Sequence, residues 1–283
     1  MKMNFSGLSN FQQRFLMSFL GIAVLTGVIV VSHTSPFQYL FVLFMAISQA
    51  AALSEYYFLS TNKGFQPHQA FPIAASIIYF FLRYALGQEQ IIVPFLFVCT
   101  LFTFIGFFSK HENSIVNIAI TIFGLLYITI PFSFLIDINF LAGSAWLAYL
   151  VITTKMTDTA AYITGKLCGK SLLAPTLSPK KTIEGALAGL IGSTAASFAF
   201  FAYFHATGQF ETLGLSWTEA LLLGVAIGLI SQIGDLAESV LKRDAKVKDS
   251  STLPGFGGML DVIDSIIFTA PLLYFWLKAK QIL

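Results

Sequence analysis

Apolar stretches long enough to cross a lipid bilayer dominate this chain of 283 residues and limit what it can fold into. A spanning helix needs about 20 predominantly apolar residues. The sequence therefore predicts an all-α, polytopic integral membrane protein with about nine transmembrane helices. They are expected at Phe15–Ser32, Phe37–Leu59, Phe71–Leu86, Ile91–Phe108, Ile115–Ile136, Leu141–Thr164, Glu184–His205, Trp217–Val240 and Ile263–Leu277.

Charge is scarce, and its scarcity excludes several classes of protein. Only 11% of the residues are charged, against about 25% in a soluble domain, which excludes an ordinary soluble enzyme. A net charge of +2 leaves no excess to match a phosphate backbone, so a nucleic-acid partner is not expected. The two cysteines exclude a disulfide-stapled scaffold.

The distribution of lysine and arginine predicts how the chain is oriented. With the N-terminus in the cytoplasm and nine helices, twelve of the 16 basic residues fall in inside segments and three in outside segments. That bias is typical of a multi-pass protein of the inner (cell) membrane. We expect one integral membrane domain over 1–283, with a helical scaffold in 1–140 and the chemistry in 141–283, at the cytoplasmic face.

Two groups of polar residues surround the first cytoplasmic loop of the second half. Asp158 and Tyr162 are four residues apart and share one helical face, and an acid within a membrane helix usually marks a functional site. Hydroxyls and lysines then precede an apolar helix, an arrangement that favours binding of phosphate. They are Ser178, Lys180, Lys181 and Thr182, with Glu184 following. The alternative is a basic anchor that contacts lipid headgroups.

The densest group of charges lies around the last cytoplasmic loop. A polar stripe of Asp235, Glu238, Ser239 and Lys242 follows helical spacing, and the next helix begins with a further acid pair. Such carboxylates suit Mg²⁺ shared with substrate phosphates, and the nearby bases could take the remaining phosphate charge. The other members are Arg243, Lys248, Asp249, Gly257, Gly258, Asp261 and Asp264. The alternative is a helical hairpin stabilised by internal ion pairs.

These groups together resemble the signature of the phosphatidate cytidylyltransferases, also called CDP-diacylglycerol synthases. The resemblance covers about Asp158 to Asp264. Its matching positions are Asp158, Ala161-Tyr162, Gly165, Gly169-Lys170, Ser178-Pro179, Lys181-Thr182, Glu184-Gly185, Gly234-Asp235, Glu238-Ser239, Lys242-Arg243, Lys248-Asp249-Ser250, Pro254-Gly255, Gly257-Gly258, Asp261 and Asp264.

The resemblance implies that CTP and phosphatidate, drawn from membrane lipid, give CDP-diacylglycerol and pyrophosphate with Mg²⁺. A second, monovalent cation and a homodimer stay open. It implies catalytic roles for Asp235, Lys242, Arg243 and Asp261, and metal binding by Asp235, Glu238, Asp261 and Asp264. Substrate binding is expected of Asp158, Tyr162, Ser178, Lys180, Lys181, Thr182, Glu184, Ser239, Lys248, Asp249, Gly257 and Gly258.

Three residues depart from the pattern. Phe256 stands where the family has His, Val262 where it has Arg, and Lys155 where an aromatic residue is expected. A valine cannot supply a planar phosphate fork, and Lys155 is a hypothetical source of replacement charge. Three alternatives therefore stay open: a CTP-dependent lipid or isoprenoid kinase, a diverged paralogue of low activity, and a transporter.

Overall fold

The computed structural model describes residues 27–87, 89–109, 112–208, 213–247 and 258–283. The predicted first span, Phe15–Ser32, lies mostly outside these residues. The helices are α2 (Phe37–Asn62), α3 (Ala70–Leu86), α4 (Ile92–Phe107), α5 (Ser114–Gly124), α6 (Ile130–Asp137), α7 (Ser144–Cys168), α8 (Ile183–Ala206), α10 (Trp217–Asp244) and α11 (Met259–Ala279), with the short turns η1 (Glu89–Ile91), η2 (Leu125–Thr129) and η3 (Ile138–Ala142).

Five helical segments of the described chain are long and apolar enough to cross a membrane. They are α2, the continuous run Ser114–Ala142 from α5 to η3, α8, α10 and α11. The all-helical class is therefore supported, while the predicted count of nine is not confirmed. Apolar α3 and α4 are shorter, and α7 is long but interrupted by Lys155, Asp158 and several threonines.

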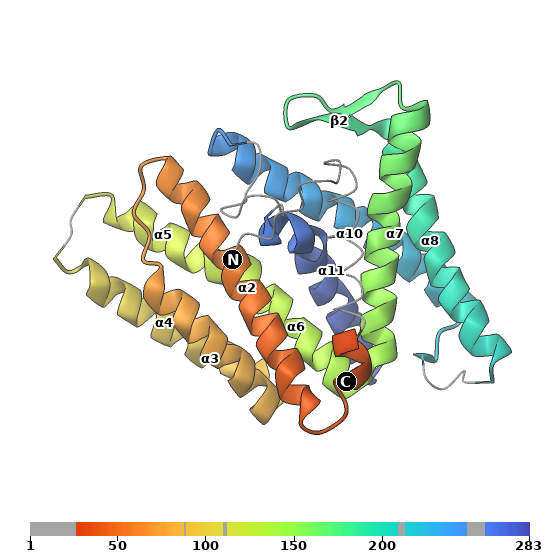
Figure 1. Ribbon diagram of the computed structural model, residues 1–283, viewed down its shortest axis with the longest axis horizontal. Coiled ribbons are helices and arrows are strands. Elements are labelled where there is room, and N and C mark those ends of the chain that lie inside the picture. The colour runs from red at the N-terminus through yellow and green to blue at the C-terminus, as the bar shows by residue number, and fades with distance from the viewer. Residues whose placement is uncertain (1–26, 88, 110–111, 209–212, 248–257) are drawn as a thin grey trace, which may run out of the picture.

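One small antiparallel hairpin interrupts the helical architecture. Strand β1 (Leu172–Ala174) pairs with β2 (Ser178–Thr182), with Leu172 opposite Thr182 and Ala174 opposite Ser178. It joins α7 to α8 and lies at one end of this helix pair (Figure 1). The sequence predicts a polar loop here, and the structure folds that loop into a compact ribbon.

The helices form two groups that meet at α10 and α11 (Figure 1). Helices α2 to α5 lie on one side, and α7 with α8 on the other. Helix α11 packs against α2 and α6 of the first group and against α7 and α10 of the second. The core that joins them is mostly aromatic and aliphatic, and its largest fully buried side chain is that of Trp146.

Two glycines allow the close helix contacts that shape the site. A Cβ atom at Gly185, at the start of α8, would lie 2.8 Å from the carbonyl oxygen of Ala161 on α7. A Cβ atom at Gly234 would lie 2.7 Å from the carbonyl oxygen of Asp264. Any larger residue would force these helices apart. Gly234 thus sets the distance between the acidic residues of α10 and those of α11.

Candidate active site

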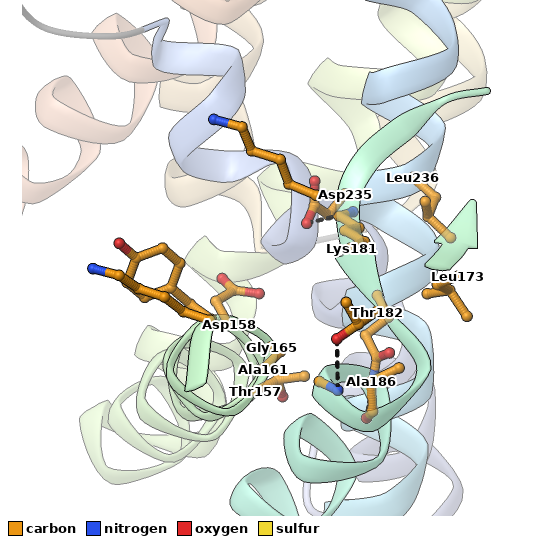
Figure 2. Close-up of a pocket in the computed structure, with 15 residues that line it drawn as sticks. Thr157, Asp158, Ala161, Gly165, Leu173, Lys181, Thr182, Ala186, Asp235 and Leu236 are labelled. Carbon is orange, nitrogen blue, oxygen red and sulfur yellow. Dashed lines mark hydrogen bonds and ion pairs between the residues drawn. The ribbon is translucent and has the colours of Figure 1, made fainter. Parts of the chain in front are cut away.

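A cavity of about 570 Å³ opens where α7, α8, α10 and the hairpin meet (Figure 2). Lys166, Lys180 and Lys181 supply its positive charge, and Asp158 and Asp235 its negative charge. The predicted site residues that line it are Asp158, Tyr162, Lys180, Lys181, Thr182 and Asp235. Its other walls include small and apolar side chains, such as Leu173 and Leu236. A charged and partly apolar space of this kind suits an amphipathic or phosphorylated ligand.

The hairpin is fixed to the start of α8 by two side chains. The Oγ1 atom of Thr182 accepts the Gly185 N–H at 3.1 Å and so caps α8. The Glu184 carboxylate accepts the backbone N–H groups of Lys170 and Ser171 at 3.1–3.2 Å. Neither Glu184 nor Ser178 lines the cavity. Glu184 therefore acts on the shape of the loop, although both were predicted to bind substrate.

An ion pair ties the hairpin to α10 across the cavity. Lys181 Nζ lies 2.6 Å from Asp235 Oδ2, and both side chains stay partly accessible (Figure 2). Arg243 also links the two elements, because its Nε donates to the carbonyl oxygen of Leu177 at 2.9 Å. The predicted catalytic Arg243 thus anchors the hairpin from the far end of α10, and it does not line the cavity.

Asp158 on α7 lies at the junction with α10 and α11. Its carboxylate is 3.3 Å from Lys155 Nζ and 3.5 Å from the Ser231 hydroxyl. Lys155 also donates to the carbonyl oxygen of Val262 at 3.0 Å. The Val262 side chain itself is exposed. An ammonium group is therefore held one hydrogen bond from the residue that replaces the family's arginine.

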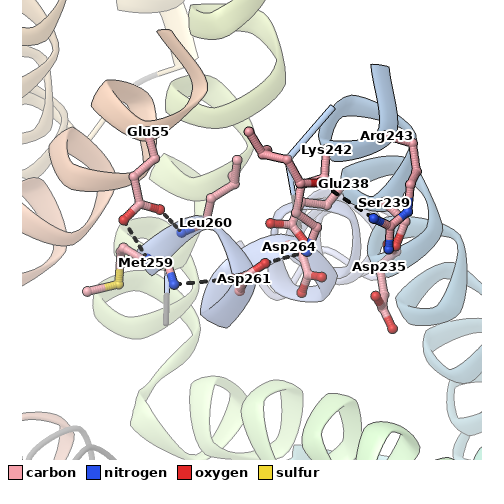
Figure 3. Close-up of polar contacts among 12 residues, drawn as sticks. Glu55, Asp235, Glu238, Ser239, Lys242, Arg243, Met259, Leu260, Asp261 and Asp264 are labelled. Carbon is pink, nitrogen blue, oxygen red and sulfur yellow. Dashed lines mark hydrogen bonds and ion pairs between the residues drawn. The ribbon is translucent and has the colours of Figure 1, made fainter. Parts of the chain in front are cut away.

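Three carboxylates converge beside the cavity. Oxygens of Asp235, Glu238 and Asp264 lie within 4.8 Å of one another, and we call these residues the acidic cluster (Figure 3). Glu238 and Asp264 are only 1% and 5% exposed. Three carboxylates this close repel one another unless cations neutralise them.

The acidic cluster fits a metal ion by the chemistry of its donors. Ligand oxygens lie 2.0–2.1 Å from Mg²⁺ in octahedral geometry, and therefore about 3–4 Å from one another. Small side-chain adjustments would bring the cluster to that spacing. In addition, the buried Oε1 of Glu238 has no hydrogen-bond partner among the described residues, and such an orphan is costly without a ligand. The cluster therefore offers hard oxygen ligands, one of them unsatisfied.

Asp261, also predicted to bind the metal, stays outside the acidic cluster. Its Oδ1 lies 2.5 Å from Lys242 Nζ, and its Oδ2 accepts the Gly258 N–H at 3.1 Å. Lys242 also contacts Glu238 at 2.6 Å. Asp261 sits in the first turn of α11, where a carboxylate folds back onto the helix N-terminus. Lys242 and Asp261 thus support the cluster from one side.

Glu55 is a functional candidate that the sequence analysis missed. Its two carboxylate oxygens accept the N–H groups of Met259 and Leu260 at 2.9 and 2.8 Å (Figure 3). This buried carboxylate of α2 therefore caps α11, the helix that carries Asp264. An acid in an otherwise apolar helix was the only available signal, because more than 200 residues separate it from its partners.

The remaining predicted residues fall into two groups. Ser239 is buried, and its hydroxyl donates to the Asp235 carbonyl oxygen within α10 at 2.9 Å. Gly258 precedes α11 as its N-cap. Lys248, Asp249, Gly257 and the divergent Phe256 lie outside the described residues. Their predicted roles stay predictions.

Comparison with known proteins identifies the family. The model of the cytidylyltransferase family matches residues 12–279. The chain is 33% identical to a phosphatidate cytidylyltransferase of Chlamydia muridarum, over 69% of this chain and 67% of the relative. Phosphatidate cytidylyltransferases of Synechocystis and Staphylococcus aureus are 46% and 38% identical, over 42% and 58% of this chain.

The alignments span different shares of these three relatives, from 38% to 67% of their own lengths. The family match itself is not partial, because it covers nearly all of the chain and includes every element of the site described above. Apolar spanning helices and relatives that act on a lipid phosphate agree on a membrane protein. The chain belongs to the cytidylyltransferase family.

Proposed function

We propose that this protein is a phosphatidate cytidylyltransferase, which converts CTP and phosphatidate to CDP-diacylglycerol and pyrophosphate. The observation that carries the proposal is the position of the acidic cluster at the wall of a lysine-lined cavity, with Asp235 belonging to both. A reaction between two phosphate-bearing substrates needs bound cations and basic side chains in one place. The names of the relatives support the same substrates.

In the proposed reaction a phosphate oxygen of phosphatidate attacks the α-phosphorus of CTP. A new P–O bond forms there, the bond to the β-phosphate oxygen breaks, and pyrophosphate leaves with the electron pair. The attacking phosphate monoester is already largely ionised near neutral pH, because its second pKa is about 6. A strong general base is therefore not required of this chain. Its residues have to hold two polyanions in line and neutralise them.

Asp235, Glu238 and Asp264 would hold Mg²⁺, which when bound supplies positive charge to phosphate oxygens. Lys166, Lys180 and Lys181 would bind phosphate from the cavity wall. Lys242 would keep Glu238 and Asp261 oriented through its two short contacts. Asp158 would fix Lys155 near the start of α11, where the family's arginine is missing.

The proposed membrane setting matches the two substrates. We place the cavity at the cytoplasmic face of the inner membrane, with a cytoplasmic N-terminus and with α3, α4 and α7 crossing the bilayer beside the five longer spans. Basic residues of the hairpin would then lie on the side where lysine and arginine are retained. Phosphatidate would enter from the leaflet and CTP from the cytoplasm.

An assay with labelled CTP tests the proposal. Purified protein in detergent is incubated with phosphatidate, Mg²⁺ and either α- or γ-labelled CTP, and the lipid products are separated. We expect label in the lipid from α-labelled CTP only. Lipid label from γ-labelled CTP alone would establish a kinase instead, and no labelled lipid at all would contradict the proposal.

Two variants of α10 make the assay specific for the site. Asp235→Asn removes a cluster carboxylate and should lower turnover more than about 100-fold, since even indirect changes around metal ligands cost 10–100-fold. Asp244→Asn is the matched control on the same helix, because Asp244 is exposed and pairs only at the surface with Lys63 at 2.6 Å. We expect the control to retain activity.

A further inference from the structure

Lys181 stands between two binding sites of opposite charge. Its ammonium group lies 2.6 Å from Asp235, the one member of the acidic cluster that also lines the cavity. The Lys181 side chain is 24% exposed and lines the same cavity, where a phosphate would bind. Figure 2 shows the pair reaching across from the hairpin to α10. Lys181 is therefore within reach of a carboxylate now and of an anion in the cavity.

A cation in the acidic cluster and Lys181 compete for the same carboxylate. With Lys181 bound, much of the negative charge of Asp235 is neutralised, which weakens its attraction for a metal ion. Two cations on one carboxylate also repel each other over a few ångströms in a site with little water. The neighbouring Oε1 of Glu238 is buried and unpaired among the described residues, so the cluster is incomplete without a further cation.

We propose that Lys181 exchanges partners: a divalent cation that binds the acidic cluster displaces it from Asp235, and the freed ammonium group then binds a phosphate in the cavity. Lys181 thereby couples the two ligands, because each favours the state that the other requires. The inference rests on the proposed function for the identity of the phosphate ligand. It adds an order of binding, with the cation before or together with the nucleotide.

Lys181 is the lysine suited to this exchange. Lys242 contacts both Glu238 and Asp261, is only 15% exposed and does not line the cavity. Lys180 lines the cavity, but it forms no ion pair within the described part of the chain. Lys180 is therefore a matched control, because it shares strand β2, the charge and the cavity with Lys181 and lacks the bond to the cluster.

The first test measures Mn²⁺ affinity of the nucleotide-free protein by electron paramagnetic resonance. Lys181→Met removes the internal competitor, so Mn²⁺ should bind about fivefold tighter or more, within the usual range of coupling between sites. Lys180→Met should bind Mn²⁺ as the unaltered protein does. Lys181→Arg, which restores a cation beside Asp235, should return the affinity toward the original value. Unchanged Mn²⁺ affinity in Lys181→Met would overturn the exchange.

The second test measures CTP binding by equilibrium dialysis, with Mn²⁺ saturating or removed by a chelator. In the unaltered protein Mn²⁺ should tighten CTP binding strongly, and in Lys181→Met this gain should shrink by about fivefold or more. Lys180→Met should weaken CTP binding while keeping the gain. An equal gain in all three proteins would contradict the exchange. A merely structural role for Lys181 would not tighten Mn²⁺ and weaken CTP in one variant.

A measurement on the unaltered protein covers the case in which Lys181→Met does not fold. Reductive methylation of lysines, mapped by mass spectrometry, should modify Lys181 faster when Mg²⁺ is present, and subsequent CTP should protect it. Lys180 should respond to CTP alone, and protection of Lys181 by Mg²⁺ would overturn the exchange. These results are independent of the product assay: without labelled lipid the proposed function fails, even where Mg²⁺ releases Lys181.

Discussion

Two sets of buried charges, one in each half of the chain, differ in how completely they are paired. In the first half the Nε atom of Arg83 donates to both carboxylate oxygens of Asp137 at 3.1 Å, and Nη1 donates to the Tyr79 hydroxyl at 2.7 Å. The guanidinium also lies 4.6 Å from the centre of the Phe134 ring. Arg83 and Asp137 are 0% and 3% exposed.

The acidic cluster of the second half is left unfinished by comparison. Its lysines come from other positions on flexible stems, Asp235 faces a cavity, and Glu238 keeps one buried oxygen without a partner among the described residues. A fully enclosed and fully bonded pair has nothing left to offer a ligand, whereas the cluster has a face, an orphaned atom and exchangeable partners. Unsatisfied bonding capacity, rather than buried charge itself, distinguishes the candidate site from the scaffold.

The largest expected change in stability comes from breaking the closed pair. Arg83→Met leaves Asp137 buried without its cation and should lower the free energy of unfolding by about 3–5 kcal/mol. Unfolding in mixed micelles measures the loss. The double variant Arg83→Met/Asp137→Leu should recover much of it, since neither charge is then left alone. A single variant as stable as the original protein would contradict a structural role, and protein that still folds should bind Mn²⁺ normally.

A smaller effect is expected where α10 approaches α11. Gly234→Ala places a methyl group against the carbonyl oxygen of Asp264, which should cost about 1–3 kcal/mol and also move Asp264 away from Asp235. Both the free energy of unfolding and the Mn²⁺ affinity should fall. Gly27→Ala is the control, because its added Cβ would meet nothing within 4 Å. A stability loss without any change in Mn²⁺ affinity would sever helix spacing from the site.

The smallest effect should follow from weakening the cap that joins the two halves. Glu55→Gln keeps one acceptor oxygen but loses the charge and one hydrogen bond to α11, which should cost about 0.5–2 kcal/mol. Glu219→Gln is matched to it, since Glu219 caps α10 at the opposite end through Ser216. We expect similar stability losses, with weaker Mn²⁺ binding only for Glu55→Gln. Equal Mn²⁺ affinities would remove Glu55 from the account of the site.

Much of the fold could be predicted, because apolar run length alone determines where helices form in this chain. The segments expected at Phe37–Leu59 and Trp217–Val240 correspond to α2 and α10. The segment expected at Ile115–Ile136 continues to Ala142 through two π-type turns, which composition does not reveal. The count of nine failed confirmation chiefly at α7, where the residues of the site reduce the apolar character that defines a span.

The site was foreseen in its residues more than in its contacts. Helical spacing placed Asp235 and Glu238 on one face, and the structure adds Asp264 beside them. Spacing could not show that Asp261 turns toward Lys242 and Gly258, since this depends on where α11 begins. It could not show Glu55 either, because a contact between distant segments leaves no periodic pattern. The hypothesis about Lys155 gains a location beside the Val262 carbonyl, and its role in activity stays a prediction.

The most direct test of the central claim is a Mn²⁺ titration of the purified protein and its carboxylate variants, followed by electron paramagnetic resonance. The account predicts that Asp235→Asn, Glu238→Gln and Asp264→Asn each lose Mn²⁺ affinity by more than about 100-fold, while Asp244→Asn keeps it. Asp261→Asn, outside the acidic cluster, should fall between them. Mn²⁺ binding that survives unchanged in all three cluster variants would contradict the account.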